Sequence, residues 1–442
     1  MDITLEKKTL TEGFIKITLK EDDYQPQVEE KIKDYSKKAN IKGFRPGKVP
    51  FNYIKKLYGK SILVEEINQI LSQSLTSYIK DNKINILGEP LPNHDKSKDI
   101  DWENQRDFDF EYNIGMVNEF QYDLSSKVKV TAYDISVDDK VINETLDNLK
   151  LQYGTMTNPE VSEAGDAFYG TLTQGDFTKD LLLESTQIDK KLAKKFVGLK
   201  GGDTIKFDLH KAFSDTHELS HILGMSEDET KAMAGDFEFS IKNINRKIPG
   251  EMNQEFFDKI FGKDNVTSEK EFLEKVKSTI GANYEKETLS FLDYSIQNKF
   301  VESTKIELPD EFLKKWLMTA NEGKITAEDI EKEYDAYIKD LKWSLIKNKI
   351  VEDEQIKVEH EDVLEKTREI IRAQFAQSGL GAQFEDSIDA FVDNYLKGEN
   401  GNNYHKVFQQ AQSEKVMACI KEKISVSHKK VDLEKFKKLV SN

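Results

Sequence analysis

Residues 41–50, which read Ile-Lys-Gly-Phe-Arg-Pro-Gly-Lys-Val-Pro, have the types and spacing best suited to recognition chemistry. Two glycines and two prolines within eight residues predict a rigid, tight excursion of the backbone, with Phe44 and Arg45 at its tip. An arginine guanidinium can form paired hydrogen bonds with phosphate or carboxylate groups. A phenylalanine on a loop gains free energy only when its ring contacts an apolar surface. We therefore expect a docking site here; the alternative is a turn whose Phe44 folds back into its own domain.

Positive charge is concentrated around this loop. The chain carries a net charge of −16, yet residues 1–60 contain 14 Lys/Arg and 9 Asp/Glu, a net +5, so the other 382 residues carry −21. Residues 36–64 contain no acid and eight bases, which are Lys37, Lys38, Lys42, Arg45, Lys48, Lys55, Lys56 and Lys60. A basic island on an acidic protein favours contact with a polyanion at this end only. The alternative is a solvated basic face.

Catalytic and metal-binding patterns are weak in the rest of the chain. The seven histidines give no clustered ligand set, and His360, followed by Glu361 and Asp362, has no histidine partner at helical i, i+4 spacing. We therefore expect no metal site and no cofactor. The sequence has no GxxxxGK[ST] loop, which argues against ATP-driven cycling. Cys419 is the only cysteine, so an internal disulfide is excluded, and we expect its side chain to pack in a core.

Length and composition predict a multidomain protein without a membrane span. A chain of 442 residues favours two to four domains, and 10% aromatic residues argue against wholesale disorder despite 33% charged residues. No run approaches the roughly 18 apolar residues that a membrane helix needs. The first residues contain no apolar stretch typical of a signal peptide. We therefore expect a cytoplasmic protein.

Residues 1–115 have the pattern of an α+β domain. Alternating apolar residues predict strands around 15–19 and 108–114. Val28, Ile32 and Tyr35 predict one amphipathic helix, and apolar residues at every fourth position from 67 to 79 predict a longer one. Two helices packed on a small antiparallel sheet are the simplest assembly, and they place the loop at 41–50 between the helices.

The remaining residues divide into three regions. Residues 116–150 read as a connector with a strand at Val128 and Val130 and a helix after Asp138. Residues 151–246 read as β-rich, with strands at 205–209 and 237–241 and an inserted loop or helix at 217–234. Residues 247–442 read as almost entirely helical, because proline is absent after Pro309, which is expected to start a helix. The glycine-containing breaks at 379–382 and 398–401 are expected to be helix tips.

The loop also resembles a known family. Gly43, Phe44, Arg45, Gly47 and Pro50 match the Gly-Phe-Arg-x-Gly-x-x-Pro signature of trigger factor, the ribosome-associated chaperone of bacteria. The resemblance implies that these residues dock beside the nascent-chain exit tunnel, on a ribosomal protein and nearby RNA. Pro46 stands where the family often has a basic residue, and the flanking side chains expected to compensate are Lys42 and Lys48.

The resemblance also implies a domain plan. It consists of an N-terminal α+β ribosome-binding domain (1–115), a connector (116–150), a β-rich FKBP-like domain of the prolyl isomerase type (151–246) and a long-helix chaperone domain (247–442). The isomerase motifs depart from the family pattern, since Gln-Gly-Asp-Phe at 174–177 shortens the usual hairpin and Lys-Lys-Phe-Val at 194–197 replaces the usual Ile-Pro-Gly-aromatic segment. The candidate pocket aromatics are Phe168, Tyr169, Phe177 and Phe196, for which core positions are the alternative.

These observations predict an ATP-independent, ribosome-associated chaperone that binds nascent and unfolded polypeptides. The resemblance adds a weak homodimer and implies no membrane partner. The first alternative is a peptidyl-prolyl cis-trans isomerase that acts on non-ribosomal substrates, although its pocket motifs are eroded. A second alternative is a periplasmic chaperone that carries a parvulin domain; the missing signal peptide and the loop signature argue against it.

Overall fold

The computed structural model describes residues 1–45, 47–98, 100–213, 215–233, 235–377 and 387–441. The chain divides into two compact units. One unit contains Met1–Ala132 and Phe291–Ser427, and the other contains Tyr133–Ser290 and His428–Asn442. Each unit therefore combines segments that are far apart in the sequence. None of the described helices is long and apolar enough to span a membrane.

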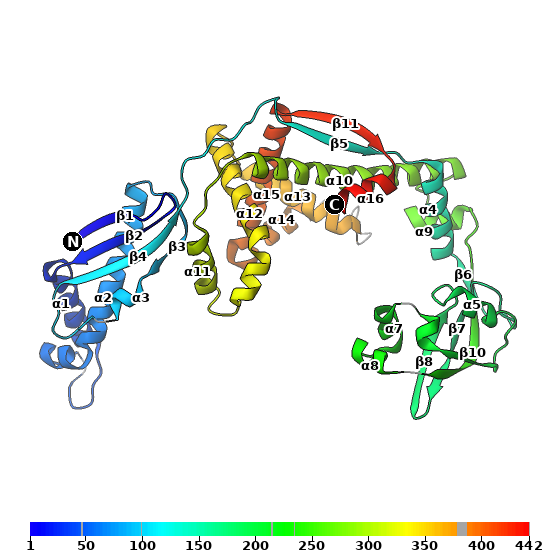
Figure 1. Ribbon diagram of the computed structural model, residues 1–442, viewed down its shortest axis with the longest axis horizontal. Helices are drawn as coiled ribbons and strands as arrows, with labels where there is room; N and C mark the ends of the chain where they lie inside the picture. Colours follow the sequence, from blue (N-terminus) through cyan, green and yellow to red (C-terminus); the bar gives the residue numbers. More distant parts are fainter. Residues whose placement is uncertain (46, 99, 214, 234, 378–386, 442) are drawn as a thin grey trace. The chain divides into compact units, whose positions relative to one another are not determined.

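The N-terminal part of the first unit is an antiparallel sheet covered by two helices (Figure 1). The strands run in the order β1-β2-β4-β3 and comprise Asp2–Lys7 (β1), Glu12–Leu19 (β2), Ile86–Pro92 (β3) and Phe108–Met116 (β4). Ile15, Ile17 and Leu19 are completely buried, as their alternation predicts. The α+β prediction for this region is confirmed.

Helices α1 (Glu21–Lys38) and α2 (Phe51–Asp81) pack together and against the sheet, and a short helix α3 (His94–Ser97) precedes β4. Val28 and Ile32 of α1 are buried, but Tyr35 is 44% exposed, so the apolar stripe ends one turn earlier than its spacing predicts. The prediction of an amphipathic helix here is confirmed.

The rest of the first unit is mostly helical. Pro309 is the N-cap of α11 (Asp310–Ala320), as predicted. The other helices are α12 (Ala327–Asp353), α13 (His360–Gln377), α14 (Ile388–Lys397) and α15 (Asn402–Lys423). The break at 398–401 forms a short 3-10 helix, η4 (Gly398–Gly401), between α14 and α15, whereas the break at 379–382 lies outside the described residues.

Helix α11 packs on the N-terminal sheet at two glycines. A Cβ atom on Gly115 of β4 would lie 2.4 Å from the Phe312 ring, and one on Gly88 of β3 would lie 2.8 Å from the Trp316 ring. The backbone N–H of Phe312 also donates to the Glu12 carboxylate at 3.3 Å. The two glycines therefore allow the ring-bearing face of α11 to approach the strands closely.

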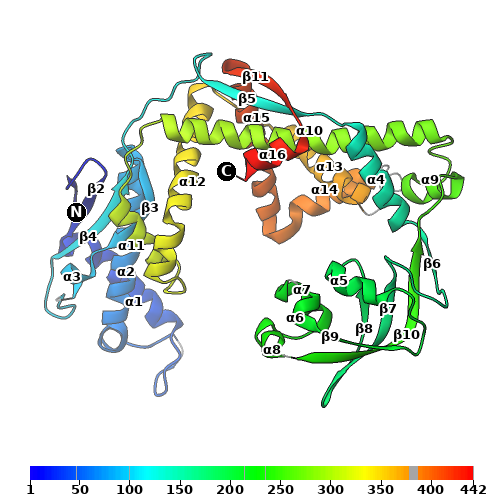
Figure 2. The ribbon, with the colours of Figure 1, turned by 45° about the vertical axis from the view of Figure 1, so that its right-hand side comes forward.

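The second unit contains a β-rich domain. Its strands run in the order β6-β10-β7-β8, with β9 also on β10, and comprise Thr155–Thr157 (β6), Ala167–Gln174 (β7), Phe177–Glu184 (β8), Thr204–Asp208 (β9) and Asp236–Ile248 (β10). Short helices join them, which are α5 (Lys190–Ala193), η1 (Lys194–Phe196), α6 (Leu209–Ala212), α7 (Thr216–Leu223) and α8 (Glu227–Ala232). Figure 2 shows α6, α7 and α8 grouped beside the strands. Helices α7 and α8 form the insertion predicted at 217–234.

Outside this domain, the second unit has a small helical core. Helix α4 (Asp139–Gln152) begins where predicted, with the Asp138 carboxylate accepting from the Val141 N–H at 2.9 Å. It packs with α9 (Gln254–Phe261) and with the first part of α10 (Glu269–Ser303), and the shared core includes Leu146, Phe256 and Phe272. Because α10 is one continuous helix, it contributes residues to both units.

The C-terminal residues differ from the helical prediction. Ser425–Val431 form a strand, β11, which pairs with β5 (Lys129–Ile135), and a last helix, α16 (Leu433–Val440), follows. The prediction that residues 247–442 are almost entirely helical is wrong for this strand. Its sequence, Ser-Val-Ser-His-Lys-Lys-Val, is mostly polar and has only Val431 fully buried, so the apolar alternation that signals a strand is weak.

Candidate functional site

The loop at 41–50 connects α1 to α2 through two successive backbone turns. The Phe44 N–H donates to the Ile41 carbonyl at 3.1 Å, and the Lys48 N–H donates to the Arg45 carbonyl at 2.9 Å. Gly43 (φ +99°) and Gly47 (φ +74°) adopt left-handed conformations that side chains rarely tolerate. Both glycines of the motif are therefore required by the backbone.

The structure places Phe44 and Arg45 differently. Arg45 is exposed, whereas Phe44 is half-buried and its ring lies 4.9 Å from the Tyr53 ring of α2. Val49 is buried and anchors the end of the loop, and Pro50 is the N-cap of α2. Pro46 lies outside the described residues. The loop thus presents the guanidinium to solvent while Phe44 partly folds back onto its own domain.

Four exposed apolar side chains lie on the helices that flank the loop, and none of them is among the site residues predicted from the sequence. We call this set the tyrosine surface; its members are Tyr35 (44% exposed), Tyr53 (40%), Leu57 (51%) and Tyr58 (38%). Tyr35 and Tyr58 are in ring contact, with centroids 5.2 Å apart. Tyr53, Leu57 and Tyr58 lie off the buried stripe of α2, which includes Ile54 and Ile62, but the sequence alone does not show that this helix face remains uncovered.

The basic island is largely free of ion-pair partners. Lys37 pairs with Asp34 at 3.0 Å, and Lys60 lies 3.9 Å from Glu103. Among the residues that the structure describes, the other six bases make no ion pair, including the exposed Lys42, Arg45 and Lys48 around the loop. Uncompensated positive charge next to exposed aromatic rings suits a negatively charged partner that also offers apolar or stacking surface.

The structure does not gather the four candidate aromatics of the β-rich domain on one surface. Phe168 and Phe196 are completely buried in the domain core, with ring centroids 5.1 Å apart. Tyr169 is 41% exposed, because neighbouring residues of a strand point to opposite faces. Phe177 starts β8 and contacts the Phe237 ring at 6.1 Å. For Phe168 and Phe196 the core alternative holds, so these two rings are not available to line an open pocket.

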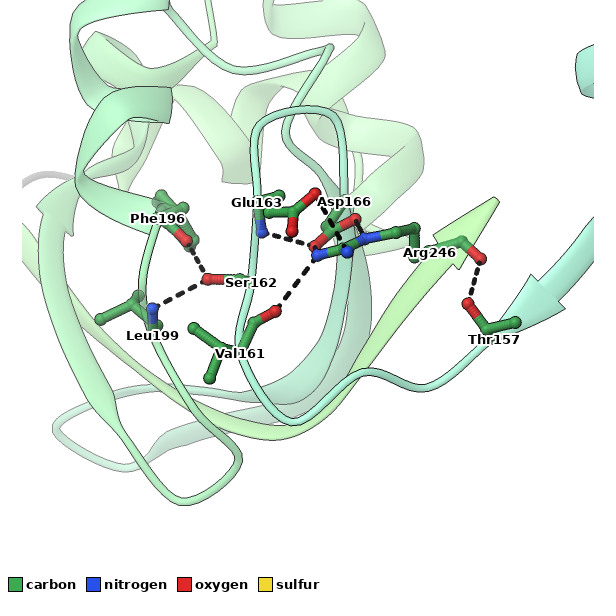
Figure 3. A network of polar contacts seen from close by, with 8 residues as sticks. All are labelled: Thr157, Val161, Ser162, Glu163, Asp166, Phe196, Leu199 and Arg246. Atoms are coloured by element: carbon green, nitrogen blue, oxygen red, sulfur yellow. Dashed lines mark hydrogen bonds and ion pairs between the residues drawn. The ribbon is translucent and has the colours of Figure 1, made fainter. Parts of the chain in front are cut away.

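A polar network ties the segment before β7 to the end of β10 (Figure 3). Arg246 reaches Asp166 through two contacts, Nε and Nη2, each at 2.8 Å. The same guanidinium pairs with Glu163 at 3.0 Å and donates to the Val161 carbonyl at 3.1 Å. The side chain of Asp166 is only 2% exposed, and its hydrogen bond from Arg246 lowers the pKa of this carboxyl below the usual range.

Ser162 extends this network to the segment that follows η1. Its hydroxyl donates to the Phe196 carbonyl at 2.6 Å and accepts from the Leu199 N–H at 2.8 Å. Its backbone N–H also donates to the Leu199 carbonyl at 2.9 Å. The segment that carries Phe196 is therefore fixed by hydrogen bonds, and the network has a structural rather than a catalytic arrangement.

Three family models match successive parts of the chain. Residues 1–149 match the bacterial trigger factor protein, residues 156–249 match the probable trigger factor FKBP-like domain, and residues 291–440 match the probable trigger factor C-terminal domain. The chain belongs to the trigger factor family. The resemblance first indicated by the loop signature is thereby confirmed, together with the three-part fold class.

Curated trigger factors of several bacteria are similar to the chain. A Salinibacter ruber relative is 21% identical, with 97% of this chain and 95% of the relative covered. A Marinobacter nauticus relative is 24% identical over 88% and 90% of the two chains, and an Acinetobacter baumannii relative is 26% identical over 70% and 68%. A solved structure of the trigger factor chaperone, described in terms of promiscuous substrate recognition in folding and assembly activities, covers 96% of this chain at 14% identity and a TM-score of 0.48.

Proposed function

We propose that this member of the trigger factor family is an ATP-independent chaperone that docks on the ribosome and holds nascent polypeptides as they emerge. The observation that carries the proposal is the loop at 41–50. Its two glycines adopt the conformations that the signature needs, and it presents an exposed Arg45 within the part of the chain that matches the bacterial trigger factor protein.

Docking combines a directed contact with general electrostatic attraction. Arg45 can bind a carboxylate of a ribosomal protein or a phosphate of nearby RNA through paired hydrogen bonds. The surrounding lysines steer the loop toward a polyanion, whereas the acidic remainder of the chain is repelled by it. Binding is thus restricted to one end of the protein and weakens as salt rises.

Client holding requires dispersed apolar surface rather than one deep pocket. Helix α10 exposes Leu289 and Tyr294, and α11 exposes Met318, each among charged residues. Isolated apolar contacts of this kind bind weakly one at a time, and several acting on one flexible chain add avidity. Such a surface delays misassembly of a client without trapping it.

The same proposal assigns a role to each domain and includes contact with RNA, a cellular location and an oligomeric state. The location of the loop supports residues 1–115 as the ribosome-binding domain, and 116–150, 151–246 and 247–442 remain the connector, the FKBP-like domain and the chaperone domain. Six bases of the basic island make no ion pair with any residue that the structure describes, which supports contact with ribosomal RNA. A cytoplasmic location is the expectation drawn from composition, and a weak homodimer is the expectation drawn from the family resemblance. Sedimentation at several protein concentrations tests the dimer.

Prolyl isomerisation by the FKBP-like domain is the second candidate function, favoured by the family match of residues 156–249. Such catalysis needs an aromatic-lined pocket that lowers a barrier of about 18–20 kcal/mol. Since Phe168 and Phe196 are buried, we propose that the activity is weak. A peptide isomerisation assay tests this: strong acceleration that is lost in Tyr169→Ala would favour the enzyme.

The docking assignment is tested by co-sedimentation with bacterial ribosomes over a salt series. Arg45→Ala is expected to weaken binding about tenfold, because a charge-assisted hydrogen bond contributes about 1.5 kcal/mol. The matched control is Arg106→Ala, an exposed arginine of the same domain that lies outside the basic island and 3.4 Å from Glu21. Equal binding of the Arg45 and Arg106 variants would contradict docking through the loop.

A further inference from the structure

Helix α7 of the FKBP-like domain carries a metal-binding pattern. Residues 217–221 read His-Glu-Leu-Ser-His, which is the H-E-x-x-H arrangement on a helix. Residues at i and i+4 lie above one another on the same helix face, so the two imidazoles are neighbours. The expectation of no metal site rests on His360 and does not account for this pair.

The two imidazoles face each other through the atoms that bind metals. The Nε2 atoms of His217 and His221 are 3.2 Å apart, and their ring planes are nearly perpendicular at 89°. Two nitrogen ligands of one tetrahedral zinc ion lie roughly 3.3 Å apart, given Zn–N distances of about 2.0–2.1 Å. The separation of the nitrogens is therefore already that of a shared ion, and both side chains are exposed.

A carboxylate orients one of the two rings. Glu227 Oε1 lies 2.9 Å from Nδ1 of His217. A carboxylate accepts, so Nδ1 of the neutral ring carries the proton and Nε2 of His217 presents its lone pair. Carboxylates bonded to the far nitrogen of a metal-binding histidine fix its tautomer and ring orientation in the same way.

The local fold holds the three side chains together. Leu219 and Leu223 bury the opposite face of α7, which turns the histidines outward. The helix ends at Gly224 in a left-handed conformation (φ +59°), and Ser226 then caps α8, whose first residue is Glu227. The turn at Gly224 thus returns the carboxylate to His217.

We propose that His217 and His221 bind one divalent transition-metal ion of the Zn²⁺ class, with Glu227 as the outer carboxylate. Imidazole ligands favour Zn²⁺, Ni²⁺ or Cu²⁺ over Mg²⁺ and Ca²⁺. The part of the chain that the structure describes contains no cluster of three or more His, Cys, Asp or Glu side chains that could hold a metal ion. Water or a client side chain completes the coordination, so the site binds a metal without the three protein ligands that zinc hydrolases use.

Isothermal titration of the full chain with Zn²⁺ alone tests the site. One ion is expected per chain, and His217→Ala and His221→Ala are each expected to lower the affinity at least tenfold. Glu227→Gln is expected to lower it about tenfold with the stoichiometry unchanged. The control is His405→Ala, an exposed helical histidine of α15 whose i+4 neighbour is Gln409 rather than histidine.

Imidazole nitrogen NMR distinguishes the metal site from a simple hydrogen bond between two neutral rings. Without metal, we expect His221 to donate its Nε2 proton to His217; with Zn²⁺, we expect that proton on Nδ1 of His221 and a shift of both Nε2 signals. His221→Gln, which keeps a polar side chain at this position, guards against loss of folding as the cause of lost binding. Zn²⁺ binding that is unchanged in both His221 variants, or no saturable binding by the wild type, would overturn the proposal.

Discussion

Two single glycine residues define the backbone geometry of the loop at 41–50. Gly43 and Gly47 both have positive φ angles, and they flank the exposed Arg45. A Cβ atom on Gly47 would also lie 3.0 Å from the Lys37 carbonyl oxygen. The direction of the guanidinium is thus set by residues that need not touch a partner themselves.

Gly47→Ala is expected to disturb the loop and weaken ribosome binding. A left-handed conformation costs about 1–2 kcal/mol for a residue with a Cβ atom, and the close Lys37 carbonyl adds to this. Co-sedimentation measures binding, and circular dichroism verifies the fold. Gly59→Ala in α2 is the control, since its Cβ meets only the flexible Lys55 side chain at 3.4 Å; it should bind normally and gain about 0.5–1 kcal/mol of stability. Normal binding by Gly47→Ala would show that the loop tolerates another backbone path.

Asp166→Ala is expected to destabilise the FKBP-like domain by about 3 kcal/mol, because it leaves the Arg246 guanidinium without its buried partner. The control, Asp180→Ala, removes an exposed carboxylate that pairs with Lys242, a residue of the strand that also carries Arg246, and should cost far less stability. Urea unfolding of both variants measures the difference. Equal losses would mean that the burial of Asp166 adds nothing.

The pH dependence of this contact follows from the lowered pKa of Asp166. A carboxyl whose folded pKa lies below its unfolded value stabilises the fold above the unfolded pKa, near 3.8, and loses this contribution as pH falls through the folded pKa. The stability gap between wild type and Asp166→Asn should therefore be full at pH 7 and shrink below about pH 4. A constant gap across this range would contradict the charge-based account.

Elements with strong apolar periodicity could be predicted from the sequence, and weakly patterned ones could not. Four-residue spacing in the pairs Phe272/Val276 and Ile296/Phe300 indicates a helix, and the structure buries all four side chains on the single helix α10. Strand β11 exposes most of its residues, so its pairing with β5, almost 300 residues away, leaves no local signal. The candidate site shows the same difference. The loop signature could be recognised in the sequence, whereas the tyrosine surface could not, because its exposure depends on which helix faces remain uncovered in the fold.

The close packing of α11 on the N-terminal sheet depends on Gly115 of β4. Gly115→Val would place side-chain atoms where the Phe312 ring and Pro309 now lie, since a Cβ atom at this position would be 2.4 and 2.8 Å from them. Overpacking of this kind costs about 1–3 kcal/mol, so α11 should detach from the sheet more readily. Hydrogen exchange measures this as faster exchange of α11 amides. The control, Gly201→Ala, meets only a carbonyl at ordinary contact distance, 3.5 Å, and should leave α11 exchange unchanged. Unchanged exchange in Gly115→Val would show that the interface can adapt.

The FKBP-like domain is inserted into the chain between two paired strands, so it can be deleted from the whole molecule without separating the flanking segments. The chain enters it through β6 and leaves through β10, and these strands pair with each other, with Thr157 opposite Arg246 and Thr155 opposite Ile248. The ends of a deletion between them are therefore neighbours, and a short Gly-Ser linker can join them. Helices α4 and α9, which pack in a separate core, remain in the shortened protein.

The deletion separates client holding from the FKBP-like domain. If the helices hold clients, a protein lacking residues 158–245 should suppress aggregation of a denatured client almost as well as the full chain, because α10 and α11 keep their exposed Leu289, Tyr294 and Met318. It should also still co-sediment with ribosomes, because the loop at 41–50 is intact.

Light scattering during client refolding measures suppression of aggregation. The matched control is the full-length Arg45→Ala protein, which is expected to suppress aggregation normally but to bind ribosomes weakly. Retained ribosome binding would show that residues 1–115 of the shortened protein still fold. Loss of suppression in that protein would then assign client holding to the FKBP-like domain.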